Sequence, residues 1–505
     1  MNIYIDTLGC AKNEYDSQML AAALVERGCS IVFEPEDADI MIVNTCGFIE
    51  DAKKESIGRI FELAEEKGRG MKLVVTGCLS ERYHSELAEE MPEVDMFFGV
   101  NDYDRLPDIL LGSGPDAEER PQERSGAAPE AADKSSEKSA PEESADKCAE
   151  KIAPEDAADK CAEKSAPEDV ADKCAEKSAP EDAARSSDMV GNVLDDLRYR
   201  KRNFDEDAYT GYLKIAEGCN NACSFCAIPS IRGHYRSKRI EDCVREAQDM
   251  ADAGIRELIL IAQDTSQYGR DLYGKLCLPD LLKKLCAIDG IEWIRLMYVY
   301  DNGITDELVE TIANEPKICK YIDMPIQHIS DNVLHRMRRQ STGDSIRAAI
   351  RMLRDRIPDV HIRTTLLVGF PGETEEDMAE LLEFIDTMKI DRLGAFAFSD
   401  EEGTPSFELD GKLDEETKQA RRNAVMEHQL RVSEELNEKK IGKVYDVIVD
   451  EMIDEDVYSG RTRYDSPEID CNVAFRCTRD LFPGDIVNVR IDNAYEYDLE
   501  GEAVD

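Results

Sequence analysis

The sequence contains no run of 18 or more apolar residues, which excludes a segment that could cross a membrane as a helix. Residues 1–7 have the alternation of a β-strand rather than the charged and apolar regions of a signal peptide. The mean hydropathy is −0.48 and 34% of the residues are charged, as in soluble proteins. We therefore expect a cytoplasmic protein with no membrane partner.

Positive charge is scarce, since 62 Lys and Arg stand against 109 Asp and Glu and give a formal net charge of −47. A surface this acidic repels phosphate backbones and favours basic partners. A general adaptation for solubility would produce the same acidity, so the charge alone does not identify the partner.

Disulfides are not expected, because the 16 Cys occur in a long chain with no sign of secretion. Such cysteines point to free thiols and metal ligands. With 505 residues the chain is too long for a single hydrophobic core, so about two to four domains are expected.

Residues 1–112 alternate short β-rich runs with amphipathic helical stretches, which predicts an α/β domain built on an open parallel sheet. We expect strands over 2–7, 40–44 and 72–76, and helices over 16–27, 48–67 and 80–90.

Residues 113–190 contain a tandem repeat with a period of 13, marked by Cys148, Cys161 and Cys174. Each unit has a proline, several alanines and many charges, but almost no large apolar side chain. Such a segment cannot bury enough surface to offset the entropy lost on ordering. We predict a disordered acidic linker, and the distant cysteines lack the local spacing of metal ligands.

Residues 205–437 repeat a strand–helix rhythm with six strands, which predicts a partial (β/α)6 barrel resembling a TIM barrel. The active site of such a barrel lies at the C-terminal ends of its strands. We expect these strands over 211–216, 257–261, 292–297, 321–323, 361–368 and 392–398.

Residues 440–505 change to short alternating runs separated by turn signals, which predicts a small antiparallel β-barrel similar to an OB-like module. The expected strands are 444–449, 458–464, 472–475, 485–491 and 495–499.

Cys219, Cys223 and Cys226 form a C-x3-C-x2-C motif in the loop after the first strand of the predicted barrel. Three thiolates at this spacing can hold one 4Fe–4S cluster, whereas structural zinc and closed clusters normally take four ligands. The fourth iron is then free to bind a small molecule, which indicates a site for chemistry. The spacing is typical of radical S-adenosylmethionine (SAM) enzymes, in which SAM chelates that iron.

Three more cysteines, Cys10, Cys46 and Cys78, each follow a predicted strand in a Gly-containing loop. The ends of parallel strands meet at one edge of a sheet, so the three thiols can converge there. With both cysteine sets, the chain resembles the methylthiotransferase family of radical SAM enzymes along nearly its whole length except the linker. That family has an N-terminal domain with three cysteines, a radical SAM core and a C-terminal TRAM domain.

Several runs are more similar to the branch of this family that modifies a ribosomal protein than to the branch that modifies tRNA. They are residues 10–13, 261–265, 268–274, 399–404 and 465–470. The resemblance implies addition of a methylthio group to the β-carbon of an aspartate in ribosomal protein S-twelve of the small subunit, free or on the ribosome. The pair Glu14-Tyr15 departs from the family, which more often has an aliphatic residue there.

The resemblance also implies two 4Fe–4S clusters and SAM as cofactors. Cys219, Cys223 and Cys226 would hold the catalytic cluster that binds SAM and, once reduced by a donor such as flavodoxin or ferredoxin, cleaves it to a radical. The radical would remove a hydrogen from the target aspartate. The first cluster, which would supply the methylthio group, is assigned to Cys10, Cys46 and Cys78.

Other residues of the predicted site have two interpretations each. Phe225 is expected to border the adenine of SAM, to pack the cysteine loop against the barrel, or both. Residues 369–374 predict a backbone turn near SAM. Contacts to SAM or substrate, or purely structural hydrogen bonds, are expected for Gln263, Asp264, Gln327 and Arg363.

The main alternative is a tRNA adenosine 2-methylthiotransferase, which has the same fold and cofactors. Residues 441–505 contain six Lys and Arg against seventeen Asp and Glu, a net charge of −11, whereas an RNA-binding barrel needs a basic face. Nucleic acid is therefore not expected as the substrate. A non-enzymatic iron–sulfur protein, the second alternative, would not cleave SAM.

Overall fold

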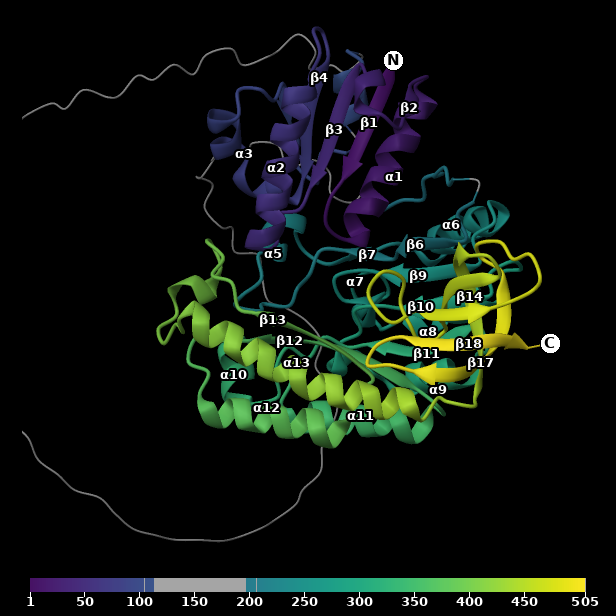
Figure 1. Ribbon diagram of the computed structural model, residues 1–505. Helices are drawn as coiled ribbons and strands as arrows, with labels where there is room; N and C mark the ends of the chain where they lie inside the picture. The colour runs from purple at the N-terminus through teal and green to yellow at the C-terminus, as the bar shows by residue number, and fades with distance from the viewer. Residues whose placement is uncertain (104, 113–196, 206, 505) are drawn as a thin grey trace, which may run out of the picture. The chain divides into compact units, whose positions relative to one another are not determined.

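Three regions of regular structure follow one another along the chain in the computed structural model (Figure 1). The structure describes residues 1–103, 105–112, 197–205 and 207–504. The predicted linker over 113–190 lies outside these residues. Among the helices of the described segments, none has both the length and the apolar character needed to cross a membrane.

The N-terminal region is a parallel five-stranded sheet in the order β2-β1-β3-β4-β5. Met41 and Val43 of the central strand pack on one face of the sheet, while Ile40 and Ile42 pack on the other. The alternation of side chains along this buried strand thus builds two hydrophobic layers. The elements are β1 (Asn2–Thr7), α1 (Ala11–Glu26), β2 (Ser30–Val32), β3 (Ile40–Thr45), α2 (Glu50–Glu66), β4 (Lys72–Gly77), α3 (Cys78–Glu90), β5 (Met96–Phe97) and α4 (Leu106–Leu110).

The first helix begins five residues before the predicted start at Asp16. Its first turns bury Lys12, Asn13 and Asp16, so polar side chains occupy the face where periodicity analysis looks for apolar ones. The short edge strands β2 and β5 were also not predicted. The three longer strands match their predicted positions to within one residue at each end.

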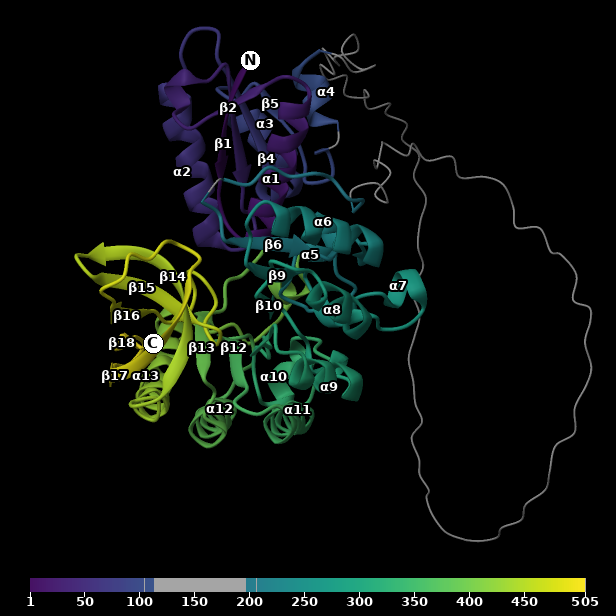
Figure 2. The same cartoon turned by 90° about the vertical axis from the view of Figure 1, so that its right-hand side faces the viewer.

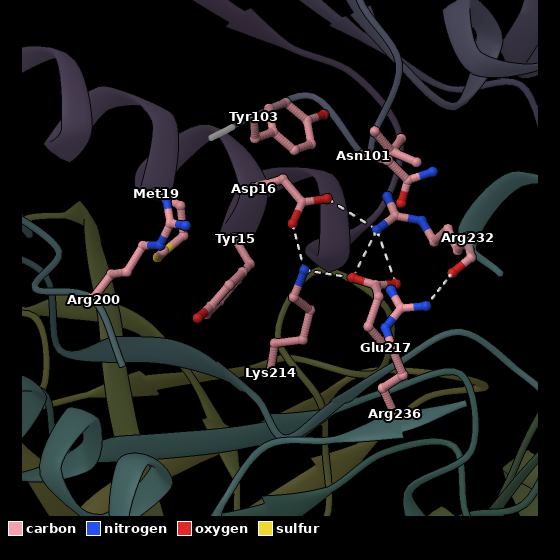
Figure 3. A pocket seen from close by; sticks show the side chains of 11 residues that line it. Tyr15, Asp16, Met19, Asn101, Tyr103, Arg200, Lys214, Glu217, Arg232 and Arg236 are labelled. Atoms are coloured by element: carbon pink, nitrogen blue, oxygen red, sulfur yellow. Dashed lines mark hydrogen bonds and ion pairs between the residues drawn. The ribbon is translucent and has the colours of Figure 1, made fainter. Parts of the chain in front are cut away.

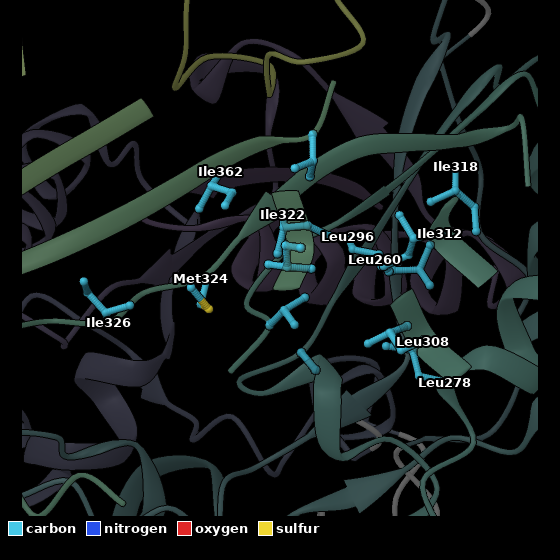
Figure 4. Packing of buried hydrophobic residues seen from close by; sticks show 14 of the residues in the cluster. Leu260, Leu278, Leu296, Leu308, Ile312, Ile318, Ile322, Met324, Ile326 and Ile362 are labelled. Carbon is cyan, nitrogen blue, oxygen red and sulfur yellow. The ribbon is translucent and has the colours of Figure 1, made fainter. Parts of the chain in front are cut away.

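The central region is an open parallel sheet of six strands in the order β13-β12-β11-β10-β9-β6, which confirms the partial barrel. Leu260, Leu296 and Ile322 from neighbouring strands lie together in the layer between the sheet and its helices (Figure 4). The strands are β6 (Thr210–Lys214), β9 (Glu257–Ile261), β10 (Trp293–Leu296), β11 (Ile318–Asp323), β12 (His361–Val368) and β13 (Arg392–Ala397).

Helices cover the outside of this sheet, and α11, α12 and α13 run side by side in both views (Figures 1 and 2). The longer helices are α6 (Ile240–Asp252), α8 (Leu278–Cys286), α9 (Asp306–Asn314), α11 (Gly343–Arg356), α12 (Glu375–Met388) and α13 (Glu415–Glu438). Shorter elements are β7 (Ala216–Glu217), α5 (Ile228–Arg232), β8 (Arg236–Ser237), α7 (Arg270–Tyr273) and α10 (Asp331–Arg336).

The 24-residue helix α13 was missed by the sequence analysis. Buried residues recur every three or four positions along this helix, but they include Lys418, Arg421 and Gln429. The sequence therefore shows no apolar stripe by which the helix could be predicted. The side chain of Asp414 caps its first turn by accepting a hydrogen bond from the N–H of Thr417 at 2.8 Å.

The C-terminal region is a closed five-stranded barrel in the order β14-β15-β16-β18-β17. Its pairs are antiparallel except β16 with β18, which is parallel. The predicted strand over 495–499 is wrong, because β17 continues to Ala494 and the chain then turns, with Tyr495 N–H bonded to the carbonyl of Asp498. The strands are β14 (Val444–Asp454), β15 (Val457–Thr462), β16 (Val473–Arg476), β17 (Ile486–Ala494) and β18 (Leu499–Val504).

Gly77, at the end of β4, has a φ of 101°, and a Cβ there would lie 2.4 Å from the carbonyl oxygen of Thr45. We predict that Gly77→Ala lowers the free energy of unfolding by about 2 kcal/mol or more, through backbone strain and overpacking. Gly58→Ala is the matched control, because Gly58 lies inside α2 with open space around it, and should be neutral or stabilising. Urea unfolding followed by circular dichroism tests the pair, and equal midpoints would contradict the prediction.

Candidate active site

The three N-terminal cysteines lie where parallel strands end. Cys10 precedes α1, Cys46 follows β3 directly, and Cys78 is the first residue of α3. Each of the three thiols is close enough to the other two to interact electrostatically. The predicted convergence at one edge of the sheet is therefore present.

Glycines allow these loops to approach one another closely. A Cβ on Gly9 would lie 2.7 Å from the Cβ of Cys46, and one on Gly47 would lie 2.7 Å from the backbone nitrogen of Leu79. Any larger residue at these positions would push the cysteine loops apart.

The second cysteine set lies in the loop between β7 and α5. Cys219 and Cys223 are buried and Cys226 is half-buried, and each thiol interacts electrostatically with the other two. The backbone N–H of Asn221 lies 3.4 Å from Cys219 Sγ, and Arg339 Nη1 lies 3.8 Å from Cys223 Sγ. These donors point at sulfur atoms that would carry negative charge as thiolates.

Burial makes most of these thiols reluctant to ionise. It raises the pKa of Cys46 and Cys219 to about 11 and that of Cys226 to about 12. Burial would also raise the pKa of Cys10, but the Lys12 and Arg232 cations outweigh it and the pKa is lowered. Thiolates in such a setting require a nearby positive charge, which bound iron would supply.

Both donor sets consist of cysteine thiols, the ligands that hold 4Fe–4S clusters. Among the described residues, no three His, Cys, Asp or Glu side chains are arranged to hold one metal ion. A 4Fe–4S cluster is larger than one ion, so its three cysteines stand further apart around it. The other cysteines of the described segments pack elsewhere, and no fourth thiol joins either set.

A buried ionic network joins α1 to the central region (Figure 3). Lys214 Nζ lies 2.6 Å from Asp16 Oδ1 and 2.5 Å from Glu217 Oε2. Arg232 Nη1 lies 2.9 Å from Asp16 Oδ2 and 3.2 Å from Glu217 Oε1. Burial alone would raise the pKa of Glu217, but the two cations outweigh it and hold the pKa well below its ordinary value.

Arg232 connects the two cysteine sets. It ends α5, six residues after Cys226, and its Nη2 donates to Asn13 Oδ1 at 2.8 Å and to Cys78 Sγ at 3.4 Å. Ala227 and Ile231 of the same segment pack in one cluster with Cys78. The chain that leaves the second set therefore packs directly on the first set.

Tyr15, the departure from the family pattern, is buried in a second ionic group between α1 and the central region. Its hydroxyl donates to Glu246 Oε2 at 3.3 Å and accepts from Lys238 Nζ at 2.9 Å. The Arg202 guanidinium lies 4.4 Å from the centre of its ring. An aliphatic residue could make only the packing contact.

The other predicted residues have structural partners. Phe225 meets Phe370 edge to face at 6.3 Å between ring centres, and remains half-buried. Gln263 Nε2 donates to Glu217 Oε1 at 2.9 Å, and Asp264 accepts from Asn221 at 2.9 Å. Within the turn at 369–374, the Glu373 carboxylate accepts from the N–H groups of Gly369 and Phe370.

Arg363 and Gln327 lie on β12 and just after β11. Arg363 pairs with Asp323 at 2.8 Å and with Asp470 at 3.4 Å. Gln327 has a positive φ of 72°, and its backbone bonds to Thr365 and Leu367. Both residues are thus held in place by structural contacts.

Sequence reasoning missed Lys214, Glu217, Arg232 and Arg339. The available signal for the first two was a Lys and a Glu in an otherwise apolar run at the end of the first barrel strand. Lys and Glu are almost never buried unless they are paired, so their presence in an apolar run can indicate a buried ionic network.

Curated relatives cover the whole length of this chain. A protein of Clostridioides difficile is 40% identical over 100% of this chain and 99% of its own length. One of Geobacter sulfurreducens is 41% identical over 99% of this chain and 97% of its own. Both are named ribosomal protein uS12 methylthiotransferase RimO.

The chain belongs to the uS12 methylthiotransferase family. It is therefore a radical SAM methylthiotransferase, and the family predicted from the cysteine motifs is confirmed. Residues 2–99 match the model of uncharacterized protein family UPF0004, 213–385 that of the radical SAM superfamily, and 441–504 that of the TRAM domain.

A solved structure shows the same fold. The radical SAM methyltransferase TsrM of Kitasatospora setae, with cobalamin and a [4Fe-4S] cluster bound, superposes with a TM-score of 0.54 and 13% identity. The match covers 88% of this chain and 80% of TsrM.

We predict that Arg232→Met lowers the free energy of unfolding by about 3–5 kcal/mol, because it leaves Asp16 and Glu217 with one cation between them. The pKa of Glu217 is lowered in the folded state, so its contribution is present above its ordinary value of 4.5 and declines as the pH falls below that value.

Arg27→Met is the control, because the Arg27–Asp108 ion pair is solvent-exposed and should contribute at most about 1 kcal/mol. Urea unfolding at pH 7 and at pH 4 compares the variants. Equal losses in the free energy of unfolding for Arg232→Met and Arg27→Met would show that the buried network stabilises the fold no more than an exposed ion pair does.

Proposed function

We propose that this protein adds a methylthio group to the β-carbon of an aspartate in ribosomal protein uS12, using SAM and two 4Fe–4S clusters. The observation that carries the proposal is the pair of three-thiol sets, both in contact with the segment around α5 and neither joined by a fourth cysteine of the described residues. The names of the full-length relatives support uS12 as the substrate.

Cys219, Cys223 and Cys226 would hold the cluster that binds SAM, and Cys10, Cys46 and Cys78 the other. When bound, these clusters would supply the electron that splits SAM and the sulfur that is transferred. An electron donor of the flavodoxin or ferredoxin class would provide the reducing equivalents.

The surrounding residues position the thiols, of which five are buried or half-buried while Cys10 is exposed. Arg339 and the N–H of Asn221 stabilise negative charge on Cys223 and Cys219. Arg232 and Asn13 fix the orientation of Cys78. Phe225 anchors its loop on Phe370, and the exposed part of its ring can border the adenine of SAM.

The C-terminal barrel suits a basic protein substrate. The tip formed by β14 and β15 exposes Glu451, Asp454, Glu455 and Asp456. This acidic tip attracts a basic ribosomal protein and repels the phosphates of tRNA. The charge therefore favours uS12, free or on the ribosome, over a tRNA adenosine.

We predict that Cys223→Ala abolishes both SAM cleavage and methylthiolation, because it removes a ligand of the cluster that binds SAM. Cys46→Ala should retain SAM cleavage and lose methylthiolation. Each variant should bind about four iron atoms in place of about eight after anaerobic reconstitution.

The matched control is Cys286→Ala, since this half-buried cysteine of α8 lies outside both sets and both activities should persist. Iron analysis and detection of 5′-deoxyadenosine after reduction with dithionite provide the readouts. Equal loss of SAM cleavage in Cys46→Ala would show that the N-terminal set has only a structural role.

We also predict the substrate of the enzyme in the cell. In a deletion strain, mass spectrometry should find uS12 lighter by one methylthio substituent, with methylthioadenosine in tRNA unchanged. If the methylthio group were instead missing from tRNA and present on uS12, the substrate would be tRNA.

A further inference from the structure

Lys12 is a largely buried lysine that pairs with no carboxylate of the described residues. Only 8% of the residue is exposed, and within the described part of the chain its ammonium forms no ion pair and no hydrogen bond. Its neighbours behave differently, because Lys214, Arg232 and Lys238 each pair with a buried carboxylate. Lys12 is therefore set apart from the ionic networks that hold α1 in place.

The ammonium lies between a predicted cluster ligand and the central region. Lys12 is two residues after Cys10, in the first turn of α1. On its other side, Lys12 Nζ lies 3.5 Å from the centre of the Tyr298 ring. Tyr298 is two residues beyond the C-terminal end of β10, at the end of the sheet where active sites of such barrels lie.

Tyr298 is a rigid support for this cation. Its φ of 58° is in the left-handed region, which a bulky residue adopts only when its surroundings enforce it. Its N–H donates to Asp323 Oδ2 at 3.0 Å, and its carbonyl accepts from the N–H of Thr265 at 3.0 Å. The strained backbone holds the ring in the position where it receives Lys12.

An aromatic ring compensates a partly desolvated ammonium less fully than a carboxylate does. The site therefore favours an anion that arrives from outside the described chain. In the proposed reaction the substrate is an aspartate, and its carboxylate is bonded directly to the β-carbon that reacts. The adenine base of a tRNA has no anionic group bonded to its reacting carbon.

We propose that Lys12 binds the side-chain carboxylate of the target aspartate and so places its β-carbon at the reaction centre. This inference rests on the proposed function and adds to it the group that selects an aspartate. Lys12 contacts the substrate but forms no bond in the reaction, and it makes the site specific for a carboxylate.

The test is a double-mutant cycle on the anaerobically reconstituted enzyme with SAM bound and without reductant. Binding is measured for uS12 carrying either the target aspartate or asparagine. The wild-type enzyme should bind the aspartate form roughly ten- to a hundredfold more tightly, as for a charge-assisted hydrogen bond. In Lys12→Met this ratio should fall to near one, and in Lys12→Arg most of it should remain.

The control variant is Lys54→Met, which removes a lysine of the same region whose side chain is 68% exposed, and should leave the ratio unchanged. SAM has a carboxylate of its own, so the KM for SAM in uS12-independent cleavage is measured as a second arm. A raised KM with an unchanged aspartate-to-asparagine ratio in Lys12→Met would assign Lys12 to SAM and overturn the inference.

Two results separate this inference from the proposed function. If the wild-type enzyme methylthiolates uS12 but binds both forms equally, the role of Lys12 is overturned and the function stands. If it cleaves SAM but neither binds nor modifies uS12, the proposed function fails, and the inference fails with it. The wild-type comparison also holds if Lys12→Met does not fold.

Discussion

The buried contact between α1 and the radical SAM region is the constraint on which the rest of the site depends. Asp16 lies on α1, Lys214 and Glu217 on the first strands of the central region, and Arg232 on α5. Charges removed from water are stable only when their partners are correctly placed. The network therefore tolerates one relative position of the two regions, and that position brings the cysteine sets together.

The cysteine sets use the geometry of parallel sheets in two ways. In the N-terminal sheet, three thiols come from three strands and meet because the strand ends share one edge. In the barrel, three thiols come from one loop after the first strands and meet because they are close in sequence. Arg232 connects the arrangements, since it follows the second set along the chain and donates to Cys78 of the first.

Charge is distributed unevenly through this interior. Most buried cations at the boundary of α1 are paired with carboxylates, and Tyr15 adds a hydroxyl to one of these groups. Lys12 instead faces the ring of Tyr298. The paired cations fix the position of α1 on the central region, whereas the ammonium of Lys12 is available to a ligand.

Sequence patterns predicted the regular parts of the fold and the grouping of the thiols into two sets, because strands, turns and ligand spacings are local. They failed at α1 and α13, whose buried faces are polar, and at the last strand, whose position depends on how β17 pairs. At α1 and α13 the error has one physical origin, because a polar residue is buried only if a distant partner receives it.

The sequence by itself determined the family, the cysteine spacing and the order of the regions. The tertiary structure alone decided that Arg232 contacts Cys78 and that Lys12 lies over Tyr298, although 286 residues separate the latter two along the chain. A sequence pattern cannot predict such a contact, because the energy of a buried charge depends on which groups surround it in space.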